Sequence, residues 1–291
     1  MAQPDISIVV ISYEMARVLP RTLLSLSPGY QRACAGIRCE IIVIDNGSTH
    51  PPEADEFAHL GLDLRILSWP DPTPSPCAAI NYGLSLARAP LIGVWIDGAR
   101  LASPGLIEAC ARALACHPRA VVATMNFQLG PQLQHNCAAR GYDAAEEDRL
   151  LASINWPLGA ERLTEISTSE IACPGTSPLL ESNALFMHRD MWAELGGYDE
   201  RFQGPGGGSA NPDMLIRACE APDAQLIRVL GEGTFHQIHG GTTTSGEGVA
   251  ADLLKMGSKQ YYRLRGKPLR TIRDIGWHYH AATKSLIMEP S

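Results

Sequence analysis

Short, unbroken runs of apolar residues alternate with amphipathic segments through the first 116 residues of the chain. The runs are rich in Val and Ile, which is typical of strands buried on both faces of a parallel sheet. The segments between them carry apolar residues at helical spacing. This alternation predicts an α/β fold in which a mostly parallel, doubly wound sheet has helices on both faces. The expected strands cover residues 6–12, 40–45, 62–67 and 91–96, and the expected helices 18–26, 51–60, 78–87 and 104–116.

The pattern is less regular in the second half of the chain. Residues 128–178 mix polar helix formers with Pro and Gly and show no clear period, which indicates an insertion. The glycine run 204–208 predicts a flexible loop. Further strands are expected over 120–124, 184–188 and 225–230, and further helices over 189–195 and 211–220.

Composition and charge narrow the possible classes of protein. The chain has 291 residues, 45% of them hydrophobic, and a formal charge of −7, which argues against broad binding to nucleic acid or anionic membranes. Eight cysteines occur without a CxxC pair, so buried reduced thiols are expected in place of a zinc or redox site. No apolar stretch approaches the ~18 residues of a membrane span, and no basic segment precedes the first apolar run. We expect a cytoplasmic protein.

Two of the expected strands stop on an acid. Asp45 ends the run EIIVID, and Asp97 ends the run LIGVWID. In open α/β sheets ligands bind beyond the carboxyl ends of the strands, so these carboxylates are candidates for one ligand site. The alternative is that each acid only starts a turn, since Asp followed by Gly or Asn is common in turns.

The order of motifs resembles a known family. The segments ISIVVISYE, EIIVIDNGST, NYGLSLARAPLIGVWIDGARLASPGLI, LGGYDERF and NPDMLIRA together resemble a family 2 inverting glycosyltransferase with the GT-A, Rossmann-like fold. The resemblance implies transfer of a sugar from a nucleoside diphosphate sugar, with UDP favoured over GDP as the nucleotide, to a hydroxyl acceptor. On this resemblance the nucleotide-sugar-binding residues are Ser12, Tyr13, Asp45, Asn81, Asp97 and Arg100.

The chain departs from the family at its metal-binding motif. Asp97 keeps the first acid of the DXD motif, but Ala99 replaces the acid that usually holds the divalent metal. His236 and His239 stand where the family often supplies a late histidine ligand. We therefore expect a metal site of Asp97, His236 and His239, with Mn preferred over Mg because imidazole suits Mn better. Arg100 could supply positive charge instead, the alternative being an ordinary surface arginine.

The general base is the second point of departure. In the family it lies in an acidic pair at the start of a helix, followed by another Asp and, four residues later, an Arg; Asp213 and Arg217 reproduce that last spacing. In this register the catalytic position is Asn211, which cannot accept a proton as a base. If the loop GPGGGSANP is threaded differently, Asp213 takes that position; we predict Asp213 as the base, with helix capping as its alternative role and Glu181 as a weaker candidate.

The resemblance also suggests how the chain is divided. We expect one glycosyltransferase domain over residues 1–265, with a nucleotide-binding half (1–125) and an acceptor and catalytic half (126–265), followed by a helical tail (266–291). The main alternative function is a catalytically impaired nucleotide-sugar-binding protein with the same fold, since both Ala99 and Asn211 depart from the family. A nucleotidyltransferase is disfavoured because SYEMARVLP lacks the glycines of a phosphate-binding loop.

Overall fold

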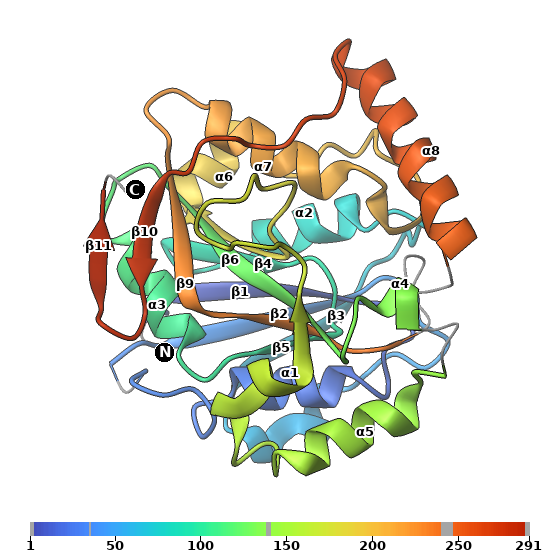
Figure 1. Ribbon diagram of the computed structural model, residues 1–291, viewed down its shortest axis with the longest axis vertical. Helices are drawn as coiled ribbons and strands as arrows, with labels where there is room; N and C mark the ends of the chain where they lie inside the picture. Colours follow the sequence, from blue (N-terminus) through green and yellow to red (C-terminus); the bar gives the residue numbers. More distant parts are fainter. Residues whose placement is uncertain (1–2, 35, 138–140, 240–246, 289–291) are drawn as a thin grey trace.

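A single mixed sheet runs through the molecule in the computed structural model, which describes residues 3–34, 36–137, 141–239 and 247–288 (Figure 1). The strand order is β11-β10-β9-β6-β8-β4-β1-β2-β3, with β5 paired to β9 and β7 paired to β6. The strands are β1 (Ile6–Ser12), β2 (Cys39–Asp45), β3 (Asp63–Ser68), β4 (Leu91–Trp95), β5 (Arg100–Ala102), β6 (Ala120–Leu129), β7 (Ser167–Ser169), β8 (Ala184–His188), β9 (Gln225–His236), β10 (Trp277–His280) and β11 (Ser285–Ile287).

The sheet is mostly parallel, as predicted. Strands β1, β2, β3 and β4 pair in parallel, and so do β6, β9 and β10. Between these two groups lies β8, which is antiparallel to both β4 and β6. The chain therefore enters β8 beside the carboxyl end of β4, where an α/β fold places its ligand site.

Helices cover both faces of the sheet because the central strands are apolar on both sides. In β1, Ile8 and Val10 contribute to one core, while Val9 and Ile11 contribute to the other. The first core includes residues of α1 and α3, and the second includes residues of α2, α6 and α7 (Figure 1). The α-helices are α1 (Leu19–Leu26), α2 (Cys77–Leu86), α3 (Leu106–Leu114), α4 (Gln134–Cys137), α5 (Ala144–Ser153), α6 (Arg189–Leu195), α7 (Ala210–Glu220) and α8 (Glu247–Arg265), and the 3-10 helices are η1 (Ala54–Leu60), η3 (Ala160–Ile166) and η4 (Pro205–Gly207).

The irregular segment 128–178 folds onto one side of the sheet. It contains α4, α5, η3 and β7. Leu151 and Leu163 pack in a third hydrophobic cluster with Leu101, Phe127 and Phe235, which belong to β5, β6 and β9. The insertion is thus anchored directly against the strands that carry the candidate site.

Several element bounds differ from the sequence prediction. Strands β6 and β9 extend to Leu129 and His236, well past the apolar runs that predicted them, because β6 and β9 continue to pair through polar residues. The segment 51–60 forms a 3-10 helix over its second part. Of the cysteines, Cys77 and Cys110 are buried, but Cys173 is exposed.

The expected helical tail is wrong for the described residues after 265. These residues form β10 and β11, and β10 pairs in parallel with β9. The physical reason is the alternation in WHYH: Tyr279 is buried in the first core and Trp277 packs against it, which is the period of a strand.

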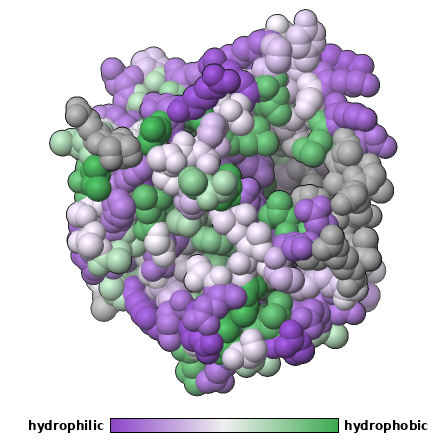
Figure 2. Space-filling model, viewed as in Figure 1, coloured by the Kyte–Doolittle hydropathy of each residue, from purple (hydrophilic) through white to green (hydrophobic). Residues whose placement is uncertain are grey.

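The surface in this orientation mixes hydrophilic and hydrophobic residues (Figure 2). Within the described residues, no helix has the length and hydropathy needed to cross a membrane.

Candidate active site

Strand pairing brings the predicted site residues together. The pairing of β4 with β8 continues beyond the strands, since the Ile96 amide donates to the Asn183 carbonyl at 3.2 Å. Strand β5 then turns back and pairs with β9 in a register that places Arg100 opposite His236. Residues distant in the chain, from the ends of β4 and β9 and the start of β8, therefore surround Asp97.

Asp97 and Arg100 form a partly buried ion pair. Arg100 Nε donates to Asp97 Oδ2 at 2.9 Å, and the Ala99 amide donates to Asp97 Oδ1 at 3.0 Å. Burial raises the pKa of Asp97, but the charge of Arg100 and the two nearby histidines outweigh this and lower it to about 2. Arg100 is only 7% exposed, so its alternative role as an ordinary surface arginine is wrong.

The two histidines lie where a metal could be held. The ligand atoms of Asp97, His236 and His239 are all within 4.8 Å of one another, and the two Nε2 atoms are 3.2 Å apart. His236 Nδ1 lies 2.7 Å from Gln134 Oε1, an atom that can only accept, so Nδ1 carries the proton and Nε2 keeps its lone pair. Burial and the charge of Arg100 lower the pKa of His236 to about 3, which keeps the imidazole neutral.

These residues fit a divalent cation. Neighbouring ligands of an octahedral ion bound at 2.0–2.1 Å lie about 3 Å apart, close to the separation of the two Nε2 atoms. Gln134 fixes the tautomer of His236, as second partners of metal-binding histidines commonly do. No sequence pattern indicated Gln134, because this residue lies in the insertion without a clear period.

Asparagines and glutamates continue the site toward α7. The side-chain amide of Asn183 lies between Arg100 and Asn211. When its oxygen is turned toward Arg100, this oxygen lies 3.0 Å from Arg100 Nη1, and the amide nitrogen lies 3.3 Å from Asn211 Nδ2. Asn211 Nδ2 also donates to Glu181 Oε2 at 3.0 Å. Glu170 Oε1 lies 3.9 Å from Arg100 Nη1. Asn183 and Glu170 were missed by sequence reasoning, because Asn183 precedes the start of β8 and Glu170 follows β7 within the segment without a clear period.

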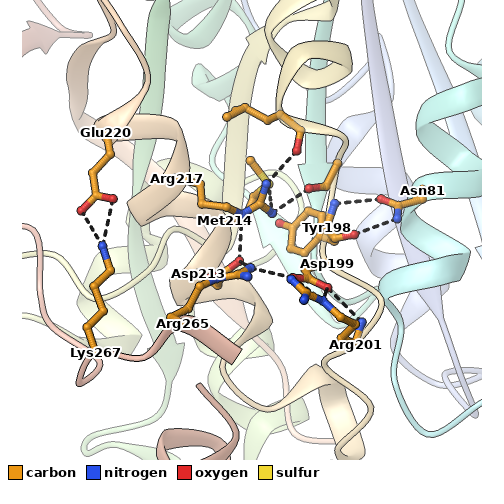
Figure 3. Close-up of polar contacts among 12 residues, drawn as sticks. Asn81, Tyr198, Asp199, Arg201, Asp213, Met214, Arg217, Glu220, Arg265 and Lys267 are labelled. Carbon is orange, nitrogen blue, oxygen red and sulfur yellow. Dashed lines mark hydrogen bonds and ion pairs between the residues drawn. The ribbon is translucent and has the colours of Figure 1, made fainter. Parts of the chain in front are cut away.

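Asp213 lies in a different environment (Figure 3). Its carboxylate is 1% exposed and accepts from Arg217 Nε at 2.8 Å and from Arg265 Nε and Nη2 at 2.6 and 2.7 Å. Arg265 also donates to Asp199 Oδ2. Both carboxylate oxygens of Asp213 are thus occupied by guanidinium donors. This geometry argues against the predicted role of Asp213 as the general base.

The residues predicted to bind the nucleoside lie at the ends of β1 and β2. Ser12 and Asp45 are paired in the register of these strands, and Tyr13, which follows, is 56% exposed. Asp45 is buried and accepts hydrogen bonds from the amides of Gly47 and Ser48 at 3.2 and 2.9 Å. Asp45 therefore shapes its own turn, and a nucleoside contact stays a prediction.

Asn81 is hydrogen bonded to the segment that follows α6 (Figure 3). Its Nδ2 donates to the Tyr198 carbonyl and to Glu200 Oε1, and its Oδ1 accepts from the Tyr198 amide. Both ends of the amide are used, so this geometry favours a role in holding the segment after α6 over a role in donor binding.

Comparison with known proteins relates part of the chain to one family. A family model described as "Glycosyl transferase family 2" matches residues 7–147. No curated protein matches the sequence. Among solved structures, S. aureus TarS superposes with a TM-score of 0.52 at 12% identity, covering 89% of this chain and 40% of that one. GalNAc-T7, solved with UDP, GalNAc and Mn2+, superposes with a TM-score of 0.57 at 14% identity, covering 81% of this chain and 44% of that one.

At these identities the structural likeness establishes the fold, and the chain spans less than half the length of either protein. The sequence match runs from β1 through β6 into α5, with Asp45 and Asp97 inside it. Just under half of the chain therefore matches glycosyltransferase family 2, and the structural likeness shows the GT-A fold.

Proposed function

We propose that this protein transfers a sugar from a UDP-sugar to a hydroxyl acceptor, with inversion at the anomeric carbon. The observation that carries the proposal is the group formed by Asp97, His236 and His239 beyond the carboxyl end of β4, within a family 2 glycosyltransferase fold. The nucleotide would lie along the strand ends toward Ser12 and Asp45, in the predicted nucleotide-binding half, and the acceptor would approach from the second half.

The charges of the site support a role for a divalent cation. The guanidinium of Arg100 interacts electrostatically with three carboxylates, those of Asp97, Glu170 and Glu181. Such a site would repel a diphosphate unless a further cation balanced the charge. Asp97, His236 and His239 would hold that cation, which we propose to be Mn because two of the three ligands are imidazoles.

Arg100 and Gln134 would orient the groups that bind the cation. When bound, the cation would neutralise the negative charge that develops on the diphosphate leaving group. Arg100 is held by Asp97 and lies beside Asn183, so its guanidinium keeps the carboxylate oriented. Gln134 fixes His236 in the tautomer that leaves Nε2 unprotonated.

A second candidate function is nucleotide-sugar binding without transfer. It is favoured by Ala99 and Asn211, which stand at positions where the family carries a metal-binding acid and the catalytic acid. The two functions differ in whether the protein cleaves its donor.

The test is thermal-shift screening against UDP and a panel of UDP-sugars, with and without Mn, followed by measurement of UDP release. A ligand that binds only the folded state must raise the melting temperature. We expect UDP to stabilise the protein more with Mn than with chelator, and UDP to be released slowly from one donor even without acceptor. Stabilisation without any release would favour the binding protein, and no stabilisation by any nucleotide would refute both.

A further inference from the structure

We propose that Glu181 is the general base of this transfer. The inference rests on the proposed function and adds the group that takes the proton from the acceptor hydroxyl. It starts from the finding that α7 presents an asparagine to the site, while Asp213 lies among arginines.

The position of Glu181 is set by β8, the antiparallel strand that lies between β4 and β6. It stands three residues before β8, in the segment that runs beside the carboxyl end of β4. Its carboxylate lies close enough to Asp97 and Arg100 for their charges to affect it. A chain of contacts runs from Glu181 through Asn211 and Asn183 to Arg100, the ion-pair partner of Asp97, and so connects Glu181 to the metal group.

The hydrogen bonding of Glu181 leaves it able to accept a proton. Asn211 Nδ2 donates to Oε2 at 3.0 Å and thereby orients the carboxylate. Among the described residues, Oε1 makes no hydrogen bond or ion pair, and the side chain is partly exposed. Asp213, in contrast, is fully occupied by Arg217 and Arg265.

The surroundings of Glu181 favour its binding of a proton. Burial, followed by the charge of Glu170, raises the pKa of Glu181 above its ordinary value, while Arg100 and the hydrogen bond from Asn211 oppose the rise. A base is most effective when its pKa approaches the working pH, so the environment of Glu181 favours the role.

The chemical step balances as follows. The acceptor oxygen forms a bond to the anomeric carbon as the bond from that carbon to the diphosphate oxygen breaks, and the bonding electrons leave with UDP. The acceptor's proton passes to Glu181. With water as acceptor, the same step gives free sugar, UDP and a proton.

The first experiment compares Glu181→Gln with Glu170→Gln, which removes a negative charge from the same site. UDP release from the donor is followed in the presence of Mn, and UDP affinity is measured by calorimetry. Glu181→Gln should lower kcat by about 10²–10⁴-fold and leave UDP affinity within a few-fold. It should also remove the acidic limb of the profile of kcat/KM against pH. Glu170→Gln should keep that limb and lose at least tenfold less in rate.

A second variant separates a chemical role from a structural one. Glu181→Ala removes the base, and azide is then added because an anionic nucleophile needs no deprotonation. Azide should restore donor cleavage and give a glycosyl azide of inverted configuration, detectable by NMR. If the wild-type protein releases UDP but Glu181→Gln stays within a few-fold of it, or azide fails to rescue Glu181→Ala, then Glu181 is not the base. If the wild type cleaves no donor at all, the proposed function fails and the base assignment fails with it.

Discussion

The replacement Asp213→Asn distinguishes a structural carboxylate from a catalytic one. Asp213 accepts three charge-assisted hydrogen bonds, one from Arg217 and two from Arg265, and is 1% exposed. Asparagine keeps the size of the side chain but removes its charge and turns an NH2 group toward guanidinium donors. The two arginines would then lose the partner around which they are arranged.

The cost can be worked from the contacts that remain. Removing one partner of a buried ion pair typically costs about 3–5 kcal/mol. Arg217 would still donate to the carbonyls of Leu195 and Gly197, and Arg265 to Asp199. The two arginine side chains are also 23% and 16% exposed, so water can solvate them in part. We therefore expect the lower end, about 3 kcal/mol, a large part of the 5–15 kcal/mol that stabilises typical proteins.

The assay is equilibrium unfolding in urea, read as the free energy of unfolding with the m-value compared between variants. The control is Asp252→Asn on α8, which makes the same chemical change at a side chain that is 79% exposed and 4.0 Å from Lys255. It should cost less than about 0.5 kcal/mol. If Asp213→Asn leaves the free energy of unfolding within about 1 kcal/mol but lowers turnover by about 10²-fold or more, Asp213 acts in the chemistry and the assignment to Glu181 is wrong.

Three further changes test the rest of the site. Asp45→Ala should weaken UDP binding by about 1.5–3 kcal/mol in calorimetry, because a charged acceptor is lost; unchanged affinity would remove Asp45 from the nucleoside site. His236→Ala should abolish the difference that Mn makes to the thermal shift given by UDP; if wild-type binding is already indifferent to Mn and chelator, the metal proposal fails and Arg100 must neutralise the diphosphate. Asn211→Asp would place a carboxylate about 3 Å from Glu181, where like charges make one of the two acids hold a proton. We expect this variant to release UDP more slowly at neutral pH, and a faster rate would show that Asn211 marks a lost base.

The central strands of the sheet were predictable because each is a short, continuous run of apolar residues. The run Ile6–Ser12 is buried at every position, so its apolar pattern predicted both its bounds and its two covered faces. The ends of β6 and β9 were not predictable in this way. Their polar residues are stabilised by pairing with each other, and such long-range pairing leaves no local period.

The site was predicted in part, for reasons that particular residues make clear. Asp97, His236 and His239 do come together, because β5 brings Arg100 opposite His236. The choice of Asp213 depended on a different threading of the loop GPGGGSANP, since Asn211 otherwise takes the family's catalytic position. In the structure Asn211 contacts Glu181 and Asn183, whereas Asp213 contacts Arg217 and Arg265. Residues four apart lie on the same face of a helix and can form an ion pair. Asp213 and Arg217 form such a pair, with Arg217 Nε 2.8 Å from Asp213 Oδ2.

The two departures from the family have a common physical meaning when the surrounding charges are counted. Ala99 and Asn211 each lack a carboxylate that the resemblance implies. Glu170 and Glu181 bring two carboxylates to the same site from the segment between β7 and β8, and Asn211 is hydrogen bonded to one of them. A protein that only bound its donor would gain nothing by keeping a partly free acid beside the metal group, since that charge opposes the diphosphate. The proposed role of Glu181, which stands three residues before β8, accounts for this negative charge, because the acid would accept a proton during transfer.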